Sequence, residues 1–479
     1  MSEDYKILVP GAVGNGDKIT VVAPWDLQPI AEIPAAAEED VERALASAYA
    51  IYRDRDRWLS IPKRIEILEK TAEIMEQRAE SLALEAALEG GKPLLDSRVE
   101  VARAIDGVKN CIEVIRTESG REIPMGLNAA SQNRVAFTRK EPIGVVVSVS
   151  AFNHPLNLIV HQVGPAVATG CPVIVKPAED TPLSCFRFVQ ILHEAGLPKE
   201  YCQSFIVNDL SLAEKLVTDE RVGFFSFIGS AKVGWMLRSK LAPGVRCALE
   251  HGGAAPVIVD ESADLEDTLP LIAKGGFYHA GQVCVSVQRV YVPKSMARDV
   301  ATHLAELAST MKIGDPTLDT TEIGPLIRPR EIDRIAAWVD AAIEQGAEKM
   351  CGGTRLSDST YECTVLLDPS DDAEVSQKEI FGPVVCVYSY DDIDEAIARA
   401  NSLPFSFQAS VLTQNLEVGL HCSRRLDAAT VMVNDHTAFR VDWMPFAGLK
   451  QSGLGVGGIP YTCEDMQIEK QYVIRSKAL

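Results

Sequence analysis

The sequence lacks any excess of positive charge. Lys and Arg together number 47 against 67 Asp and Glu, so the chain carries a net charge of -20. A protein this acidic does not attract nucleic acid phosphates or anionic membrane surfaces over long range. We therefore expect neither nucleic acid nor a membrane as a partner.

Long hydrophobic runs and paired cysteines are also missing. No apolar run of about 18 residues occurs, and the opening MSEDYKILVP has no basic segment followed by an apolar stretch. The 11 cysteines are an odd number, with no Cys-x-x-Cys pair, and a chain of 479 residues needs no disulfides to hold its core. We expect a reduced, cytoplasmic protein without a metal site.

The pattern of apolar residues predicts an α/β fold. Residues 38–89 and 100–115 show helical spacing, and short β-branched runs alternate with helices after that. Such uninterrupted runs are typical of parallel strands covered on both faces. The runs are GVVVSVS from Gly144, PVIVKP from Pro172, SFIVND from Ser204 and VGFFSFIGS from Val222. A second alternation covers residues 257–433, with helices expected over 299–311, 330–345 and 393–401.

Two isolated strands are expected outside these alternations. Residues 134–139 and 469–475 have extended patterns and would together form a small sheet. The predicted fold class is therefore α/β, with two doubly wound α/β domains and a small β element. The expected limits are 1–120 with 142–250 for the first domain, 251–445 for the second, and 121–141 with 462–479 for the β element.

A glycine-rich segment near the end of the chain matches a dinucleotide-binding pattern. Gly453, Gly455 and Gly458 fit Gly-x-Gly-x-x-Gly. No apolar strand leads into this segment, Pro460 follows it, and too few residues remain for a βαβ unit. We interpret it as a glycine-rich turn.

Three polar residues stand where chemistry is plausible. Cys284 follows Gly281 in a loop-like segment, although a cysteine in apolar surroundings is usually inert; His279 could pair with it but is better explained as structural. Glu250 ends an apolar stretch, which would raise its pKa and suit a general base, the alternative being a cap or surface acid. Asn153 follows a strand, where its amide could donate to an oxyanion or simply form a turn.

Six motifs occur in the order and spacing of the aldehyde dehydrogenase superfamily, which the chain resembles over essentially its whole length. They are Phe152-Asn153-x-Pro155, Lys176-Pro-Ala-Glu179, Phe227-x-Gly229-Ser230, Glu250-x-Gly-Gly, Gly281-Gln-Val-Cys284 and Glu379-Ile-Phe381-Gly-Pro-Val. Within the superfamily, the segments around Asn153 and Phe227 and from Asn434 to Phe446 look like the lactaldehyde, glycolaldehyde and non-phosphorylating glyceraldehyde-3-phosphate dehydrogenase branch.

The resemblance implies NAD(P)-dependent oxidation of a small hydroxy- or otherwise polar aldehyde to its carboxylic acid. Cys284 would attack the aldehyde, and Asn153 with the cysteine N–H would hold the oxyanion of the thiohemiacetal. Hydride loss leaves a thioester, which water activated by Glu250 would hydrolyse. Coenzyme A-acylating relatives commonly lack this glutamate, so free acid is expected. A coenzyme A-acylating semialdehyde dehydrogenase and a catalytically retired structural relative are the alternatives.

The resemblance also assigns the cofactor and the domains. The first domain would bind NAD, the second would carry the catalytic cysteine, and the β element would join subunits of a homodimer or homotetramer. Glu179 accepts hydrogen bonds from a ribose 2′-hydroxyl and repels a 2′-phosphate, which favours NAD, although NADP is possible. The expected cofactor-binding residues are Ser150, Phe152, Lys176, Glu179, Gly229, Ser230, Gly234, Glu379 and Phe381.

Two departures from the superfamily pattern concern the substrate. His154 and Arg440 replace apolar residue types at positions that face the substrate tunnel in relatives. We expect one or both to receive a polar or anionic substituent; a packed histidine and a solvated arginine are the alternative. Val283 stands where relatives that act on phosphorylated aldehydes often have arginine, which argues against a phosphorylated substrate.

Overall fold

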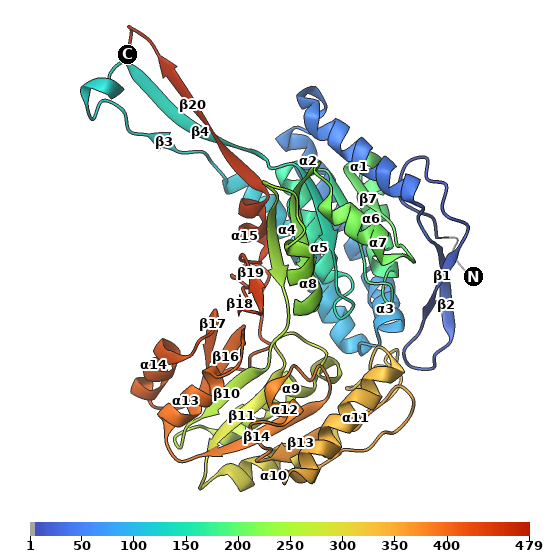
Figure 1. The fold of residues 1–479 in the computed structure, drawn as a ribbon, viewed down its shortest axis with the longest axis vertical. Helices are drawn as coiled ribbons and strands as arrows, with labels where there is room; N and C mark the ends of the chain where they lie inside the picture. The colour runs from blue at the N-terminus through green and yellow to red at the C-terminus, as the bar shows by residue number, and fades with distance from the viewer. Residues whose placement is uncertain (1–4) are drawn as a thin grey trace.

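Two large sheets form separate lobes, and a narrow arm extends away from one of them (Figure 1). The computed structural model describes residues 5–479; the first four residues of the expected first domain lie outside that range. Within it, no helix has the length and apolar character needed to cross a bilayer.

The first lobe is built on a six-stranded sheet in the order β19-β9-β8-β5-β6-β7. Its strands are parallel except β19, which pairs antiparallel with β9. The strands are β5 (Val145–Val149), β6 (Val173–Lys176), β7 (Cys202–Ser204), β8 (Val222–Ile228), β9 (Arg246–Glu250) and β19 (Gly453–Leu454).

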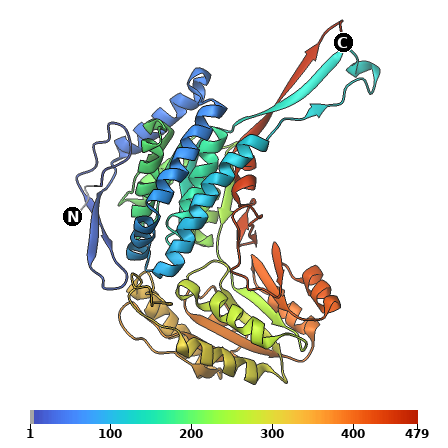
Figure 2. The same cartoon turned by 180° about the vertical axis from the view of Figure 1, so that it is seen from behind.

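Helices cover both faces of this sheet because its strands are apolar on both sides. Val145 and Val147 pack in one core with α1, whereas Val146 packs in another with α4 and α5. The view from behind shows the long helices of the second core (Figure 2). The helices of this lobe are α1 (Glu38–Arg53), α2 (Ile61–Gln77), α3 (Ala79–Gly90), α4 (Leu94–Thr117), α5 (Asn157–Thr169), α6 (Leu183–Glu194), α7 (Leu210–Thr218), α8 (Ala231–Arg238) and α15 (Ile459–Asp465).

The second lobe contains a seven-stranded sheet in the order β12-β13-β14-β11-β10-β16-β17, which is parallel except for β12. Its strands are β10 (Ala255–Val259), β11 (Val287–Pro293), β12 (Glu348–Cys351), β13 (Thr364–Leu367), β14 (Val384–Tyr390), β16 (Gln408–Leu412) and β17 (Thr430–Val433). Its helices are α9 (Leu265–Phe277), α10 (Ala297–Thr310), α11 (Pro329–Glu344), α12 (Glu374–Gln377), α13 (Ile393–Asn401) and α14 (Leu416–Arg425).

The arm is a three-stranded antiparallel sheet in the order β20-β4-β3. Strand β20 (Gln467–Arg475) pairs along its length with β4 (Arg134–Pro142), and β3 (Glu122–Ile123) pairs with the other edge of β4. Two further two-stranded sheets are formed by β1 (Lys18–Val22) with β2 (Pro29–Pro34) and by β15 (Phe405–Ser406) with β18 (Leu449–Lys450). The two isolated strands therefore do form a small sheet, within one chain; its role between subunits stays a prediction.

The expected fold class is confirmed, and one strand was predicted wrongly. The run SFIVND was expected to be a strand, but β7 ends at Ser204. Phe205 and Ile206 stay buried, yet the carbonyl of Ile206 accepts the N–H of Ala36 instead of pairing within the sheet. The exact domain limits stay a prediction.

Candidate active site

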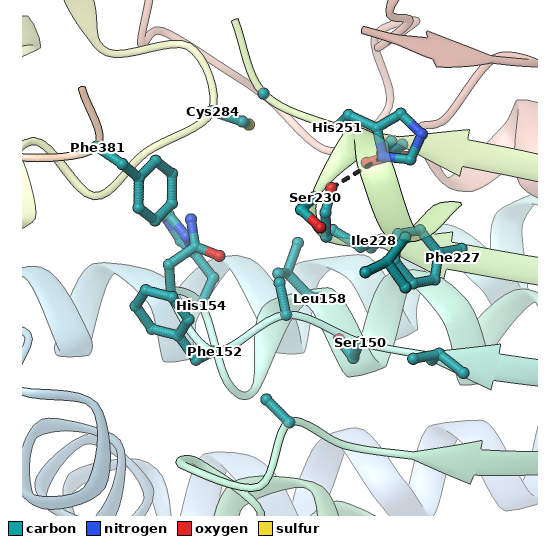
Figure 3. A pocket seen from close by; sticks show the side chains of 18 of the residues that line it. Ser150, Phe152, His154, Leu158, Phe227, Ile228, Ser230, His251, Cys284 and Phe381 are labelled. Atoms are coloured by element: carbon teal, nitrogen blue, oxygen red, sulfur yellow. Dashed lines mark hydrogen bonds between the residues drawn. The ribbon is translucent and has the colours of Figure 1, made fainter. Parts of the chain in front are cut away.

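A cavity of about 990 Å³ lies at the carboxyl ends of the first sheet's strands, against the loops that precede β11 and β14 (Figure 3). This is where open α/β sheets bind ligands. The expected site residues all line it except Gly234. A Cβ at Gly234 would lie 2.0 Å from Cε1 of His251, so this glycine makes room for the His251 ring.

Asn153 and the loop that carries Cys284 hold one another in place. The buried Asn153 side chain donates from Nδ2 to the carbonyl of Gln282, at 2.9 Å. The Gln282 side chain in turn donates to the carbonyl of Pro325 and accepts the N–H of Ile327. One Nδ2 hydrogen of Asn153 is thus used for positioning, and the other is available to a ligand.

The backbone before Cys284 is unusual. His279, Ala280 and Gly281 follow one another with φ of 49°, 53° and 70°. A Cβ on Gly281 would lie 2.0 Å from the carbonyl oxygen of Gly382, so close backbone packing requires glycine here. Both ring nitrogens of His279 are buried without a hydrogen bond, and burial holds its pKa well below the ordinary value. A neutral, structural histidine fits these observations.

Cys284 is a protonated thiol in the resting protein. Burial raises its pKa to about 12, the nearby Arg440 charge acts in the opposite direction, and Glu250 and Glu379 raise the pKa further. A thiol attacks a carbonyl only after it loses its proton. The proton must therefore leave, to water or to a base, before the attack.

Glu250, at the end of β9, is a carboxylate that lines the same cavity. Burial raises its pKa, and Arg440 partly offsets the increase. A Cβ on Gly457 would lie 2.1 Å from its Oε1, so the glycine-rich segment packs its backbone against this carboxylate. That segment is the turn between β19 and α15, in agreement with our interpretation of it.

The residues expected to bind the dinucleotide include several unsatisfied polar groups. Ser150 Oγ and Glu379 Oε1 are buried without hydrogen-bond partners. Ser230 stands at the N-cap position of α8 without a side-chain capping bond, and backbone N–H groups there favour an anion. Lys176 pairs with Glu179; burial raises the pKa of Glu179, but the Lys176 charge and hydrogen bond bring it below the ordinary value. These groups fit a phosphate and sugar hydroxyls.

Glu379 and Phe381 lie next to the thiol end of the cavity. Burial raises the pKa of Glu379 to about 8, and its Oε1 occupies the position that a Cβ on Gly252 would fill. The rings of Phe152 and Phe381 meet edge to face, with centroids 5.8 Å apart. Figure 3 shows both rings on the same side of Cys284, with Phe381 between Phe152 and the level of the thiol.

His154 and Arg440 differ in charge. Nε2 of His154 lies 3.3 Å from the hydroxyl of Tyr278, and burial, together with nearby cations, holds its pKa well below the ordinary value, so the ring is neutral. The guanidinium carbon of Arg440 lies 3.6 Å from the centroid of the Phe446 ring. Arg440 is therefore the cation that could receive an anionic group.

Six further polar residues, of which Arg103, Asn157 and Tyr278 line the cavity and the other three lie behind its lining, were not predicted from the sequence. They are Arg103, Asn157, His161, Tyr278, Gln282 and Asp442. The one available signal was the i, i+4 spacing of Asn157 and His161, which places both on the same face of α5.

Residues 12–472 match the family model described as the aldehyde dehydrogenase family. The chain belongs to the aldehyde dehydrogenase family. It is 38% identical to the 3-sulfolactaldehyde dehydrogenase of Priestia aryabhattai over 461 residues, which are 96% of this chain and 95% of the relative. It is therefore an NAD(P)-dependent oxidoreductase.

Two crystal structures resemble this aldehyde dehydrogenase over nearly its whole length. Aldehyde dehydrogenase 21 from Physcomitrella patens, in complex with its reaction product succinate, is 32% identical, with a TM-score of 0.95 and 99% of both chains covered. The glyceraldehyde-3-phosphate dehydrogenase of Methanocaldococcus jannaschii, complexed with NADP, is 32% identical, with a TM-score of 0.91 and 96% of this chain and 100% of that chain covered. The predicted family branch is confirmed.

Proposed function

We propose that this aldehyde dehydrogenase oxidises a small polar aldehyde to the free carboxylic acid, with Cys284 as nucleophile. The observation that carries the proposal is the convergence of Cys284, Asn153 and Glu250 on one cavity from three separate segments. A nucleophile, an oxyanion donor and a base are the groups that thioester chemistry needs.

The first half of the reaction forms a carbon–sulfur bond. Cys284 transfers its proton to water, the thiolate attacks the aldehyde carbon, and the carbonyl oxygen becomes an oxyanion. The free hydrogen of Asn153 Nδ2 and the N–H of Cys284, which donates to no other group in the described chain, are the donors for it. Fixed donors stabilise a charge that exists only after attack, so they lower the barrier.

The second half breaks that bond. Phe152, Glu379 and Phe381 would hold a nicotinamide that would accept the hydride from the former aldehyde carbon, and a thioester would then remain on Cys284. Glu250 takes a proton from water as the water attacks the thioester and passes it to the departing sulfur, so that the thiol and the carboxylic acid are released. Burial moves the pKa of Glu250 upward, toward neutral pH, and a carboxylate with a higher pKa is a stronger base.

Several observations support the cofactor assignment. Ser150, Lys176, Glu179, Gly229 and Ser230 would hold the adenosine and phosphate part. Phe152, Glu379 and Phe381 would hold the nicotinamide ribose and ring, whereas Gly234 contributes by making room for His251. Because Glu179 is an ionised carboxylate beside Lys176, NAD is the preferred cofactor and NADP the weaker one.

Arg440 is proposed to receive the polar or anionic substituent, and the neutral His154 to hydrogen-bond the substrate. We also propose a reduced cytoplasmic protein that forms homodimers or homotetramers. In support, β20 and β3 leave open edges on the arm, which need cover, and oxidation of Cys284 would stop turnover.

NADH absorbance with a panel of small aldehydes tests the proposal. The parent protein should form NADH without coenzyme A, and Cys284→Ala should form none while still binding NAD+. Turnover in Cys284→Ala would contradict the mechanism. A requirement for coenzyme A would favour the acylating alternative, and no turnover with any aldehyde would favour a retired enzyme.

A further inference from the structure

A buried carboxylate lies behind the side of the cavity that Arg103, Asn157 and Arg440 form. Asp442 is 1% exposed and belongs to the segment between β17 and β18. Its two oxygens accept hydrogen bonds from Arg103 on α4, through Nε at 3.1 Å and Nη2 at 2.7 Å. They also accept from Asn157 Nδ2 at 3.2 Å and lie 2.7 Å from His161 Nε2, both on α5.

The hydrogen bonds fix the protonation of this cluster. Burial alone would raise the pKa of Asp442, but the bonds from His161 and Arg103 hold it well below its ordinary range, so it is a carboxylate. Burial and the charge of Arg440 lower the pKa of His161 to about 4, so the ring is neutral. Since Asp442 can only accept, the single ring hydrogen of His161 stands on Nε2.

That tautomer leaves Nδ1 of His161 as an acceptor, and Arg440 uses it. Nη2 of Arg440 lies 3.3 Å from His161 Nδ1. The other side of the guanidinium lies over the Phe446 ring. The hydrogen bond to His161 and the contact with the Phe446 ring therefore fix the plane of the Arg440 guanidinium and the direction of its remaining N–H groups.

Of the two arginines on this side of the cavity, Arg103 and Arg440, only Arg103 pairs with a carboxylate among the described residues. Arg103 is held bidentately by Asp442, so those two charges offset one another. Arg440 forms no ion pair within residues 5–479, and its Nε is buried without a hydrogen bond. Leaving a buried donor unsatisfied costs free energy, which a ligand with acceptor oxygens would recover.

We infer that His161, held by Asp442, aims the Arg440 guanidinium, and that this arrangement selects aldehydes carrying one negative charge, a carboxylate or a sulfonate. The inference rests on the proposed function and adds positioning residues to it. Arg103, Arg440 and Asp442 together carry a net charge of +1, which a single monovalent anion balances. A phosphate dianion would leave a negative charge uncompensated beside Glu250, at a point where the low dielectric makes it costly.

Two of the relatives are consistent with this selection, whereas the Methanocaldococcus jannaschii structure is named for glyceraldehyde 3-phosphate, a phosphorylated aldehyde. One is named for 3-sulfolactaldehyde, and another was crystallised with succinate as its product. Both compounds carry an acid group, a sulfonate or a carboxylate, besides the reacting carbon.

The test compares two aldehydes of the same shape. 4-Oxobutanoate carries a carboxylate, and 4-methylpentanal has two methyl groups in place of the carboxylate oxygens. The readout is the ratio of their kcat/KM values in the parent, in His161→Leu, which removes both hydrogen bonds, and in His161→Gln, whose amide can donate to Asp442 and accept from Arg440.

We expect the parent to prefer 4-oxobutanoate and His161→Leu to lower the ratio by about tenfold or more, through KM rather than kcat. His161→Gln should restore most of the ratio. An equal loss for both aldehydes, or a loss in kcat alone, would overturn the inference while leaving the proposed function standing. Absence of turnover with either aldehyde in the parent would instead count against the proposed function.

A second variant keeps the inference testable if His161→Leu does not fold. Asp442→Asn preserves shape but removes the charge that offsets Arg103, so the cluster gains one positive charge. The ratio of kcat/KM for glyceraldehyde 3-phosphate to that for 4-oxobutanoate should rise by about tenfold. An unchanged or lower ratio would show that charge at Asp442 does not set the selection.

Discussion

Replacing Gly457 with alanine would move one methyl group into the Glu250 carboxylate. The new Cβ would lie 2.1 Å from Glu250 Oε1 and 3.0 Å from the carbonyl oxygen of Phe446. Gly457 is not among the glycines with positive φ, so its backbone accepts alanine. The carboxylate must retreat by more than about 1 Å to reach a normal contact of about 3.5 Å.

The expected cost follows from that displacement. Misplacing a catalytic group by about 1 Å costs roughly 100-fold in rate, which corresponds to about 2.7 kcal/mol in the barrier. We therefore expect kcat for 4-oxobutanoate to fall by about 100-fold in Gly457→Ala. Gly419→Ala on α14 is the matched control, because the nearest atom to its new Cβ is 3.5 Å away, and it should keep the parent kcat.

A double variant shows whether the loss acts through Glu250. Glu250→Gln alone should lower kcat by about 100-fold to 10,000-fold, the range for general bases. Adding Gly457→Ala should cause little further loss, because the group that it displaces has already been disabled. A kcat within about threefold of the parent in Gly457→Ala, or losses that multiply in the double variant, would refute this reasoning.

Three further results are expected. Glu250 must be deprotonated to act, so kcat should fall as the pH drops through its raised pKa. In Arg440→Gln, measured with saturating 4-methylpentanal, this acidic limb of the pH profile should move to higher pH, because the cation that lowers the pKa of Glu250 is gone. An acidic limb at the same pH in both proteins would contradict this. Glu179→Ala should raise KM for NAD+ about tenfold and improve the relative use of NADP+, whereas equal losses with both cofactors would not fit. Lysine at Val473 and Ile474, both exposed on β20, should lower the oligomer mass measured by light scattering, and an unchanged mass would contradict a role of the arm between subunits.

Local patterns of apolar residues in the sequence predicted most of the fold. The apolar β-branched runs predicted β5, β6 and β8 because their packing on both faces demands such residues, and helix α13 begins and ends where its spacing predicts. The run after Ser204 failed because its burial comes from contact with the segment at Ala36, which a local pattern does not distinguish from a strand.

The site was predictable where the motifs fall at strand ends, as for Asn153 and Glu250. The Asp442 cluster was not, because Arg103 and His161 lie 339 and 281 residues away from Asp442 in the chain. Each of the three looks like an ordinary helix or loop residue by itself. The contact of Gly457 with Glu250 was hidden for the same reason, since only the folded chain brings the turn against β9.

We propose that oxidation passes through a thioester on Cys284 that Glu250 helps to hydrolyse. Glu250→Gln mixed with NAD+ and 4-oxobutanoate, then quenched in acid after one turnover, tests it by mass spectrometry. We predict a mass increase equal to the acyl group, located on the peptide that contains Cys284, together with no more than one NADH per site. NADH formation with an unmodified Cys284, or with the acyl group on another residue, would contradict the account.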